Sequence, residues 1–270
     1  MNKNNGVENV KSPGEFTCRV SEQLSLAPDY YLLSLEAPEL ARAASPGEFA
    51  MLRCGEGYDN FLRRPMSIHQ VDRSKGQVDI LYQVRGKGTN WLSKRASGDL
   101  LPLLGPLGHG YTCSGPAGKG LLIGAGVGVA PLLFLASELA ARQWKLVILM
   151  GARSKAGILR PDAYMEYGEV KTATEDGSVG MQGTILDLAA NELENSTFDM
   201  IFSCGSLPVL RGVQELSRQK GIPAELSLDE RMACGVGACV GCVCQGADGS
   251  YLKVCQDGPV FSAGEVILND

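Results

Sequence analysis

Five of the nine cysteines of this chain lie close together near its carboxyl end, and they constrain the fold more than any other feature. The surrounding segment, from Leu228 onward, is rich in glycine and shows no helical period, so something other than a large core holds it. An odd number of unevenly placed cysteines is a poor framework for disulfides. In a reducing compartment, such thiols are better explained as metal ligands.

The spacing of these cysteines is specific. Cys234, Cys239 and Cys242 follow C-x4-C-x2-C, and Cys255 comes after twelve intervening residues. Three thiolates on a tight loop and a fourth from a separate segment are the plant-type arrangement of a [2Fe–2S] cluster. The glycines between them suit a loop that must point sulfurs inward and offer amide donors to them. The spacing therefore predicts Cys234, Cys239, Cys242 and Cys255 as cluster ligands.

The cysteine spacing is also compatible with a zinc ion in place of the cluster and with a different cysteine ligand. A structural zinc site uses four cysteines as well, although usually from two C-x2-C pairs. Cys244 could replace Cys242 as a ligand. We favour Cys242 for its spacing and interpret Cys244 as a small buried residue.

Charge and hydropathy exclude several classes of protein. The 25 Lys and Arg against 30 Asp and Glu give a net charge of −5, which argues against a nucleic-acid binder. Apolar residues make up 44% of the chain, so a packed core is expected. Met1–Lys11 lacks the apolar core of a signal peptide, and the longest apolar run, Leu121–Ala136, is too short and too rich in glycine to span a bilayer. We expect a cytoplasmic protein without a membrane span.

The first part of the chain, from residue 16 to about 104, reads as short extended segments broken by turns. Examples are Tyr30–Leu35, Glu48–Leu52 and Gln77–Val84. Such strands predict a small antiparallel barrel. Thr89–Arg95 is predicted as one short helix with Thr89 as its N-cap.

After residue 118 the pattern changes to apolar runs that alternate with helical stretches, which predicts a parallel sheet covered on both faces. The predicted strands are Gly120–Ile123, Leu146–Met150, Phe198–Ser203 and Ile222–Leu228. The predicted helices are Ala130–Arg142, Thr184–Asn191 and Leu207–Lys220. We therefore divide the chain into a barrel domain (13–115), an α/β domain (116–227) and a small cysteine-bearing module (228–270).

Two glycine-containing turns follow predicted strands of the α/β domain. Leu121–Pro131 reads LLIGAGVGVAP, and amides at such a strand–turn–helix junction can bind phosphate. The Rossmann fingerprint would need glycine where Val129 stands, so a tight turn without a ligand explains the sequence equally well when it is taken alone. Cys204-Gly205 ends another strand, where ligands gather in parallel sheets, although an isolated cysteine more often only packs.

A third group of motifs lies in the predicted barrel. Arg64 of the sequence RPMS can form two hydrogen bonds to a phosphate, and Ser67 offers a hydroxyl and an amide. Leu81-Tyr82-Gln83 comes next, followed by Gly88-Thr89, whose amides could hold a second phosphate oxygen. Each motif alone is weak evidence, because an arginine on a barrel strand usually faces solvent.

Taken in order, these motifs resemble the ferredoxin-reductase family of flavin and nicotinamide oxidoreductases. The matching elements are RPMS, LYQ, GT, GAGVGVAP and the late CG turn. With the tail DERMACGVGACVGCVC, their order is similar to that of the electron-transfer subunits of bacterial NAD-dependent dihydroorotate dehydrogenases, which are iron–sulfur flavoproteins of this family. The resemblance covers nearly the whole chain from Phe16.

The resemblance implies three cofactor sites and no catalytic side chain. FAD would be bound in the barrel by Arg64, Pro65, Met66, Ser67, Leu81, Tyr82, Gln83, Gly88 and Thr89. The substrate NAD would bind at Gly124, Gly126, Gly128, Val129, Ala130 and Pro131, with Cys204 and Gly205 near its reacting ring. The [2Fe–2S] cluster would be held by Cys234, Cys239, Cys242 and Cys255.

The implied function is an electron relay. An FMN-containing dihydroorotate dehydrogenase subunit, in a two-plus-two heterotetramer, would oxidise dihydroorotate for pyrimidine biosynthesis, and electrons would pass through [2Fe–2S] and FAD to NAD+. The flavin would lie between the other two groups because it can exchange one electron or two. The histidines, His69 and His109, are interpreted as structural, since the relay needs no general acid or base from this chain.

Alternatives for the function also stay open. The same cofactors would serve a subunit of another redox complex, such as a hydrogenase, a sulfide dehydrogenase or a ferredoxin–NADP type, whereas a zinc-bound tail would indicate a non-catalytic protein. Arg153 and Ser154 could contact a 2′-phosphate of NADP or only solvent. Met232, Val236 and Val240 are candidates for an apolar patch at the cluster edge, or pack beneath the loop.

Overall fold

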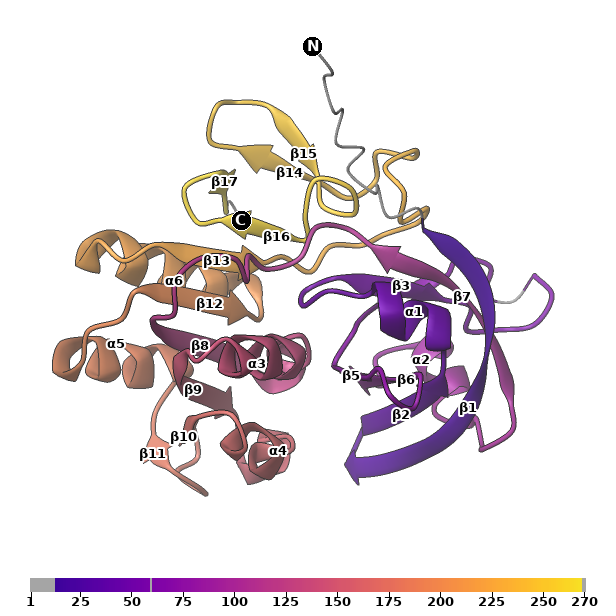
Figure 1. Cartoon of the computed structure of the whole chain (residues 1–270), viewed down its shortest axis with the longest axis horizontal. Helices are drawn as coiled ribbons and strands as arrows, with labels where there is room; N and C mark the ends of the chain where they lie inside the picture. Colours follow the sequence, from indigo (N-terminus) through magenta and orange to yellow (C-terminus); the bar gives the residue numbers. More distant parts are fainter. Residues whose placement is uncertain (1–12, 59, 269–270) are drawn as a thin grey trace, which may run out of the picture.

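The computed structural model describes residues 13–58 and 60–268 and arranges them in three β-sheets (Figure 1). Met1–Lys11, the segment without a signal-peptide pattern, lies outside the described residues, as do residues 269–270 at the end of the predicted module. No helix within the described ranges is long and apolar enough to cross a membrane.

The amino-terminal part is a curved antiparallel sheet. Its strands lie in the order β4-β3-β7-β1-β2-β6-β5 and curl into a half-barrel, which confirms the predicted antiparallel architecture (Figure 1). Alternate side chains of a strand point into one core, as Cys18 and Val20 do from β1. The strands are β1 (Gly14–Ala27), β2 (Tyr30–Glu36), β3 (Phe49–Leu52), β4 (Arg64–Ser67), β5 (Gln70–Asp72), β6 (Gln77–Gln83) and β7 (Leu100–Leu107).

Two short helices, α1 (Pro38–Ala43) and α2 (Lys87–Leu92), accompany this sheet. The prediction of Thr89 as the N-cap of α2 is wrong, because the helix begins earlier and its N-cap is Gly86. The Thr89 hydroxyl instead accepts hydrogen bonds from the amides of Arg85 and Gly86, at 2.9 and 3.2 Å. The third residue of a helix can reach back to the cap in this way, so the threonine still stabilises the helix start.

The second part is a parallel sheet in the order β11-β10-β9-β8-β12-β13-β16, with helices on both faces, as predicted (Figure 1). Leu121 and Ile123 of β8 face the core beneath α5 and α6, whereas Leu122 faces the core beneath α3. The strands are β8 (Lys119–Ala125), β9 (Lys145–Ala152), β10 (Glu169–Thr174), β11 (Met181–Gln182), β12 (Met200–Cys204), β13 (Ala224–Ser227) and β16 (Val260–Ser262). The helices are η1 (Gly126–Val129), α3 (Leu132–Ala141), η2 (Lys155–Gly157), α4 (Pro161–Met165), α5 (Ile185–Asn195) and α6 (Leu207–Lys220).

The carboxyl-terminal segment contributes to two sheets. β14 (Val243–Gly246), β15 (Tyr251–Lys253) and β17 (Val266–Ile267) form a small sheet, whereas β16 pairs antiparallel with β13 at the edge of the parallel sheet. His109, in the connection between the first two parts, ties this segment down. Its amide donates to the Gly258 carbonyl at 2.6 Å, and its Nδ1 lies 2.7 Å from the Gln256 carbonyl oxygen.

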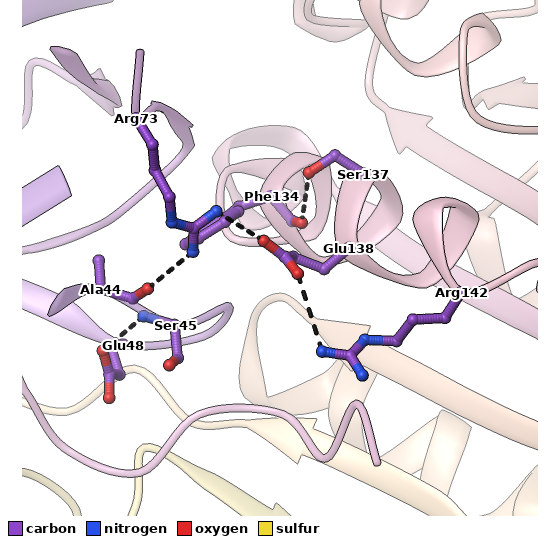
Figure 2. Close-up of polar contacts among 8 residues, drawn as sticks. All are labelled: Ala44, Ser45, Glu48, Arg73, Phe134, Ser137, Glu138 and Arg142. Carbon is purple, nitrogen blue, oxygen red and sulfur yellow. Dashed lines mark hydrogen bonds and ion pairs between the residues drawn. The ribbon is translucent and has the colours of Figure 1, made fainter. Parts of the chain in front are cut away.

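A side-chain network joins the half-barrel to α3 (Figure 2). Arg73, which follows β5, lies 2.8 Å from Glu138 Oε1 and donates to the Ala44 carbonyl at 3.3 Å. Its guanidinium also lies over the Phe134 ring, 5.5 Å from the centroid. Phe134 belongs to α3 by sequence but is buried in the core of the half-barrel, so the two parts share a core as well as polar contacts.

His69 forms a second contact between these parts and is fully buried. Its Nδ1 lies 2.7 Å from the Ala130 carbonyl oxygen, and its Nε2 lies 2.6 Å from Arg160 Nη1. Since an arginine only donates hydrogen bonds, Nε2 accepts and Nδ1 donates. Burial lowers the pKa of His69 to about 3, outweighing the hydrogen bond to Ala130 that raises it, and the Arg160 charge lowers it further. The ring is therefore neutral at pH 7.

A neutral buried histidine predicts a loss of stability in acid. The unfolded chain binds a proton at this position below about pH 6.5, but the folded chain does so only near pH 3, so the free energy of unfolding falls as the pH falls between these values. We expect the slope of the free energy of unfolding against pH to be smaller in His69→Asn than in the wild type, by up to about 1.4 kcal/mol per pH unit. Chemical denaturation of both proteins between about pH 4 and 6 measures the effect, and equal slopes would contradict it.

Candidate functional site

A cleft of about 740 Å³ lies where the three parts of the chain meet. Its wall combines strand ends of the half-barrel, two turns of the parallel sheet and the segment around the cysteines. The predicted cofactor-binding residues that line it are Arg64, Pro65, Met66, Ser67, Leu81, Tyr82, Gln83, Thr89, Gly126, Gly128, Ala130, Pro131, Cys204 and Gly205. Gly88, Gly124 and Val129 do not line the cleft, and neither do Arg153 and Ser154.

Arg64, which the sequence predicts to bind phosphate, lines the half-barrel side of the cleft. Arg64 is half-buried and donates to the carbonyls of Leu62 and Arg63, and it forms no ion pair within residues 13–58 and 60–268. Gly88 lies against its guanidinium, since a Cβ there would be 2.9 Å from Arg64 Nε. An arginine without a carboxylate partner, held beside a helix start, can bind a diphosphate.

The two turns of the parallel sheet touch each other. A Cβ on Gly128 of η1 would lie 2.5 Å from the Cys204 carbonyl oxygen and 2.8 Å from the Gly205 Cα, so this contact requires glycine. The turns follow β8 and β12, which are neighbours in the sheet. Ligands gather at such carboxyl ends of parallel strands. Gly124 and Val129 support the turn from behind, because Val129 is buried against Gly124.

The Cys204 side chain is a buried, neutral thiol. Burial raises its pKa to about 12, and the Asp229 carboxylate acts in the same direction. At neutral pH it therefore offers no thiolate nucleophile beside the turn.

Sequence reasoning missed a third side of the cleft. It is formed by residues at the end of β13, just after it, or on β14 and β17, among them Ser227, Leu228, Asp229, Glu230, Met232, Cys244, Gln245 and Ile267. The first residues of this third side could have been predicted from the sequence. Ligands gather at the carboxyl ends of parallel strands, and β13 is a parallel strand that ends at Ser227. The later members come from the small sheet, and no sequence pattern indicates where that sheet packs.

The four predicted cluster ligands lie in two pairs. The Cys239 amide donates to Cys234 Sγ and the Cys255 amide to Cys242 Sγ, both at 3.4 Å. The Gly237 amide connects the pairs, because it belongs to the Cys234 loop and donates to Cys255 Sγ at 3.1 Å. In the part of the chain that the structure describes, no three His, Cys, Asp or Glu side chains are arranged to hold one metal ion. Four thiols brought together from one loop and one later turn are the ligand set of a [2Fe–2S] cluster.

Backbone amides control the chemistry of these sulfurs. Burial acts to raise the pKa of Cys234, but amide hydrogen bonds from Val236 and Cys239 outweigh it and lower the pKa to about 6. Burial and the hydrogen bond with Cys242 raise the pKa of Cys255 to about 12. Amide donors to sulfur are also the groups that adjust the potential of a bound cluster.

Cys242 and Cys244 have different surroundings. The Cys242 thiol is buried beside Cys255. Cys244 is only half-buried, which corrects its interpretation as a buried residue, because it lies on β14 and lines the cleft. This arrangement favours Cys242 as the ligand. Cys244 follows Cys242 by two residues and lines the cleft, so the candidate cluster site and the candidate flavin site adjoin.

The apolar residues predicted at the cluster edge divide into two groups. Val236 and Val240 are 45% and 57% exposed, on the loop that carries the exposed Cys239. Met232 is half-buried, packs against the core and lines the cleft. Val240 has a φ of 56°, a left-handed conformation that is rare for a β-branched residue. The loop therefore presents apolar side chains and a strained backbone at the surface.

Comparison with known proteins supports this description of the tail. The family described as "Iron-sulfur cluster binding domain of dihydroorotate dehydrogenase B" matches residues 229–267. That range contains all four predicted cluster ligands and most residues of the third side of the cleft, which begins two residues earlier at Ser227.

Similarity extends over most of the chain. A "Dihydroorotate dehydrogenase B (NAD(+)), electron transfer subunit" of Geobacillus thermodenitrificans (strain NG80-2) is 43% identical over 253 residues, which cover 92% of this chain and 97% of the relative. The protein of the same name from Desulforamulus reducens is 38% identical over 256 residues, covering 93% of this chain and 98% of the relative.

Solved structures confirm the fold. The chain is similar, with a TM-score of 0.83 and 27% identity, to the structure described in "Insights into flavin-based electron bifurcation via the NADH-dependent reduced ferredoxin-NADP oxidoreductase structure", covering 93% of this chain and 90% of that one. A ferredoxin NADP+ reductase from Neisseria gonorrhoeae with bound FAD and NADP shares the fold alone, with a TM-score of 0.64 and 16% identity over 77% of this chain and 92% of that one. By the extent of the sequence matches, the chain belongs to the family of electron transfer subunits of NAD(+)-dependent dihydroorotate dehydrogenase B.

Proposed function

We propose that this chain carries electrons from a dihydroorotate-oxidising partner to NAD+ through a [2Fe–2S] cluster and FAD. The observation that carries the proposal is the shared cleft, whose wall unites the half-barrel motif, the two turns and the segment around the cysteines. The relatives are named as electron transfer subunits of dihydroorotate dehydrogenase B, which supports the same assignment.

The cofactors divide the chemistry among themselves, because a nicotinamide exchanges two electrons as hydride, a [2Fe–2S] cluster exchanges one, and a flavin does both. The residues of the chain hold these groups near one another. Arg64 and the amides at the start of α2 bind the diphosphate of FAD, and the strand ends β4 and β6 bind its ring. The turns at Gly126–Val129 and Cys204-Gly205 bind the nicotinamide nucleotide. Because a cluster supplies electrons only, a proton from solvent would join the flavin before hydride passes to NAD+, and the hydride transfer itself would need no acid or base from the chain.

The partner is an FMN-containing dihydroorotate dehydrogenase catalytic subunit, and two copies of each chain form the complex. The word "subunit" in the relatives' name supports a partner. Val236 and Val240 are exposed on the loop of Cys239, so a partner seated there would bring its own cofactor near the cluster. The complex works in the cytoplasm, where cysteines outside the cluster stay reduced.

A second candidate is a subunit that serves another redox complex, and the likeness to the ferredoxin-NADP oxidoreductase structure favours it. Both candidates require flavin and iron–sulfur absorption bands in the purified chain, whereas a colourless protein with stoichiometric zinc contradicts both. The anaerobically purified chain is then mixed with an FMN-containing dihydroorotate dehydrogenase. Formation of NADH on addition of dihydroorotate supports the first candidate, and its absence with an intact spectrum supports the second.

A cysteine substitution separates the two halves of the relay. We expect Cys239→Ser to lose the iron and sulfide and to abolish partner-dependent NAD+ reduction, because an alcohol replaces a thiolate in one of the two pairs. NADH oxidation by an artificial two-electron acceptor should remain within about twofold of the wild type, since FAD alone supports it. Cys244→Ser is the matched control and should keep the cluster. Loss of both activities in Cys239→Ser would contradict the proposed division.

An arginine pair tests the flavin site. Arg64→Ala should weaken FAD binding by about 10- to 100-fold, the effect of removing charged hydrogen bonds to a phosphate. Arg63→Ala is the control, because Arg63 pairs with Glu15 and does not line the cleft. Titration of the deflavinated proteins with FAD, followed by fluorescence quenching, measures both affinities. Equal affinities would exclude Arg64 from the diphosphate site.

A further inference from the structure

The main chain connects the proposed flavin site to a buried histidine. Ser67, the last residue of β4, lines the cleft, and His69 follows two positions later. The His69 amide donates to the Asp79 carbonyl at 2.9 Å, so its backbone is anchored to β6 of the half-barrel. The main chain of His69 is therefore fixed to the strand whose other residues, Leu81, Tyr82 and Gln83, line the cleft.

The His69 side chain reaches out of the half-barrel and into the parallel-sheet part. Its Nδ1 donates to the carbonyl of Ala130, at the end of the turn proposed to bind nicotinamide, over 2.7 Å. Arg160, the N-cap of α4, donates to the Nε2 at 2.6 Å and so fixes which nitrogen carries the proton. The bond from Arg160 is therefore available only while the ring is neutral, whereas Nδ1 donates to the turn in either protonation state.

A second buried side chain holds the same turn. The hydroxyl of Tyr164, on α4, donates to the Val129 carbonyl at 2.7 Å, and the tyrosine is fully buried. Two consecutive carbonyls of the turn are thus held from the side away from the cleft, while Gly128, Ala130 and Pro131 line the cleft. Of the two tethers, His69 is the one that comes from the flavin-binding part.

We propose that His69 is a positioning residue that sets the distance between the flavin and the nicotinamide, with Arg160 and Tyr164 holding the ring and the turn in place. The inference rests on the proposed function, because it assumes that these two groups occupy the cleft. Hydride transfer requires near-contact of the reacting atoms, and a displacement of about 1 Å can slow it roughly 100-fold. The hydrogen bond from His69 reaches Ala130, which lines the cleft, and provides such control, whereas Arg73 joins the same two parts through Glu138, which does not line it.

The test compares His69→Leu, His69→Asn and Tyr164→Phe in the flavin-loaded protein. Leucine cannot donate to the Ala130 carbonyl, whereas the side-chain amide of asparagine can donate from nearly the position of Nδ1. In stopped-flow mixing with NADH, we expect flavin reduction to be about tenfold or more slower in His69→Leu, largely restored in His69→Asn, and several-fold slower in Tyr164→Phe. The long-wavelength charge-transfer absorbance between reduced flavin and NAD+ should weaken in the same order.

Two controls separate positioning from general damage. Arg73→Gln removes a contact between the same two parts and should leave the rate of flavin reduction within about twofold of the wild type. Reduction of the flavin by electrons from the cluster should be unchanged in all variants, because His69 touches neither the cysteine loop nor β14 in the described contacts.

The outcomes distinguish failure of the positioning role from failure of the proposed electron-transfer function. If NADH fails to reduce the flavin of the wild type, the proposed function is wrong. If the wild type is reduced but His69→Leu matches it in rate and in charge-transfer absorbance, the positioning role is wrong. Should His69→Leu fail to fold, Tyr164→Phe decides, and a wild-type rate and absorbance there would overturn the proposal.

Discussion

The structure depends on the packing of the cysteine-bearing tail against the half-barrel. Phe49, Met51 and Leu107 of β3 and β7 share one core with Cys242, Val254 and Cys255. Burial of these apolar side chains holds a glycine-rich segment that has little core of its own. It also brings the thiol pairs next to the wall of the cleft. The third side of the cleft therefore depends on this contact.

The same packing couples the folding of the tail to whatever fills the site. β16 belongs to the parallel sheet and β14 to the small sheet, so the segment between Cys242 and Val260 bridges them. A group bound by the four sulfurs stabilises only the folded arrangement of this segment, and a nucleotide in the cleft stabilises contacts among all three parts. The hydrogen bond between the neutral His69 ring and Ala130 connects two of the parts, and Tyr164 holds the neighbouring carbonyl from within the parallel-sheet part.

Local features were the most predictable. The cysteine spacing is carried by one loop and one later turn, and the boundaries of α6 follow from a local apolar period, so the sequence predicts both. The 14-residue length of β1 is not apparent, because two register shifts interrupt its alternation. The sequence misplaces the N-cap of α2 because glycine has no side chain that marks a helix start. Threonine at the third helical position, by contrast, is a residue type that commonly caps helices.

The sequence by itself determined the kinds of groups this chain can bind, because ligand spacing, strand-turn-helix junctions and the RPMS segment are short-range patterns. Only the tertiary structure decided which of these patterns share a cleft, which of two nearby cysteines is buried beside Cys255, and which residues stand behind the wall. Such contacts join residues far apart in sequence, as His69 meets Ala130 and Gly128 meets Cys204. They follow from how whole sheets pack, and no periodicity within one segment records that packing.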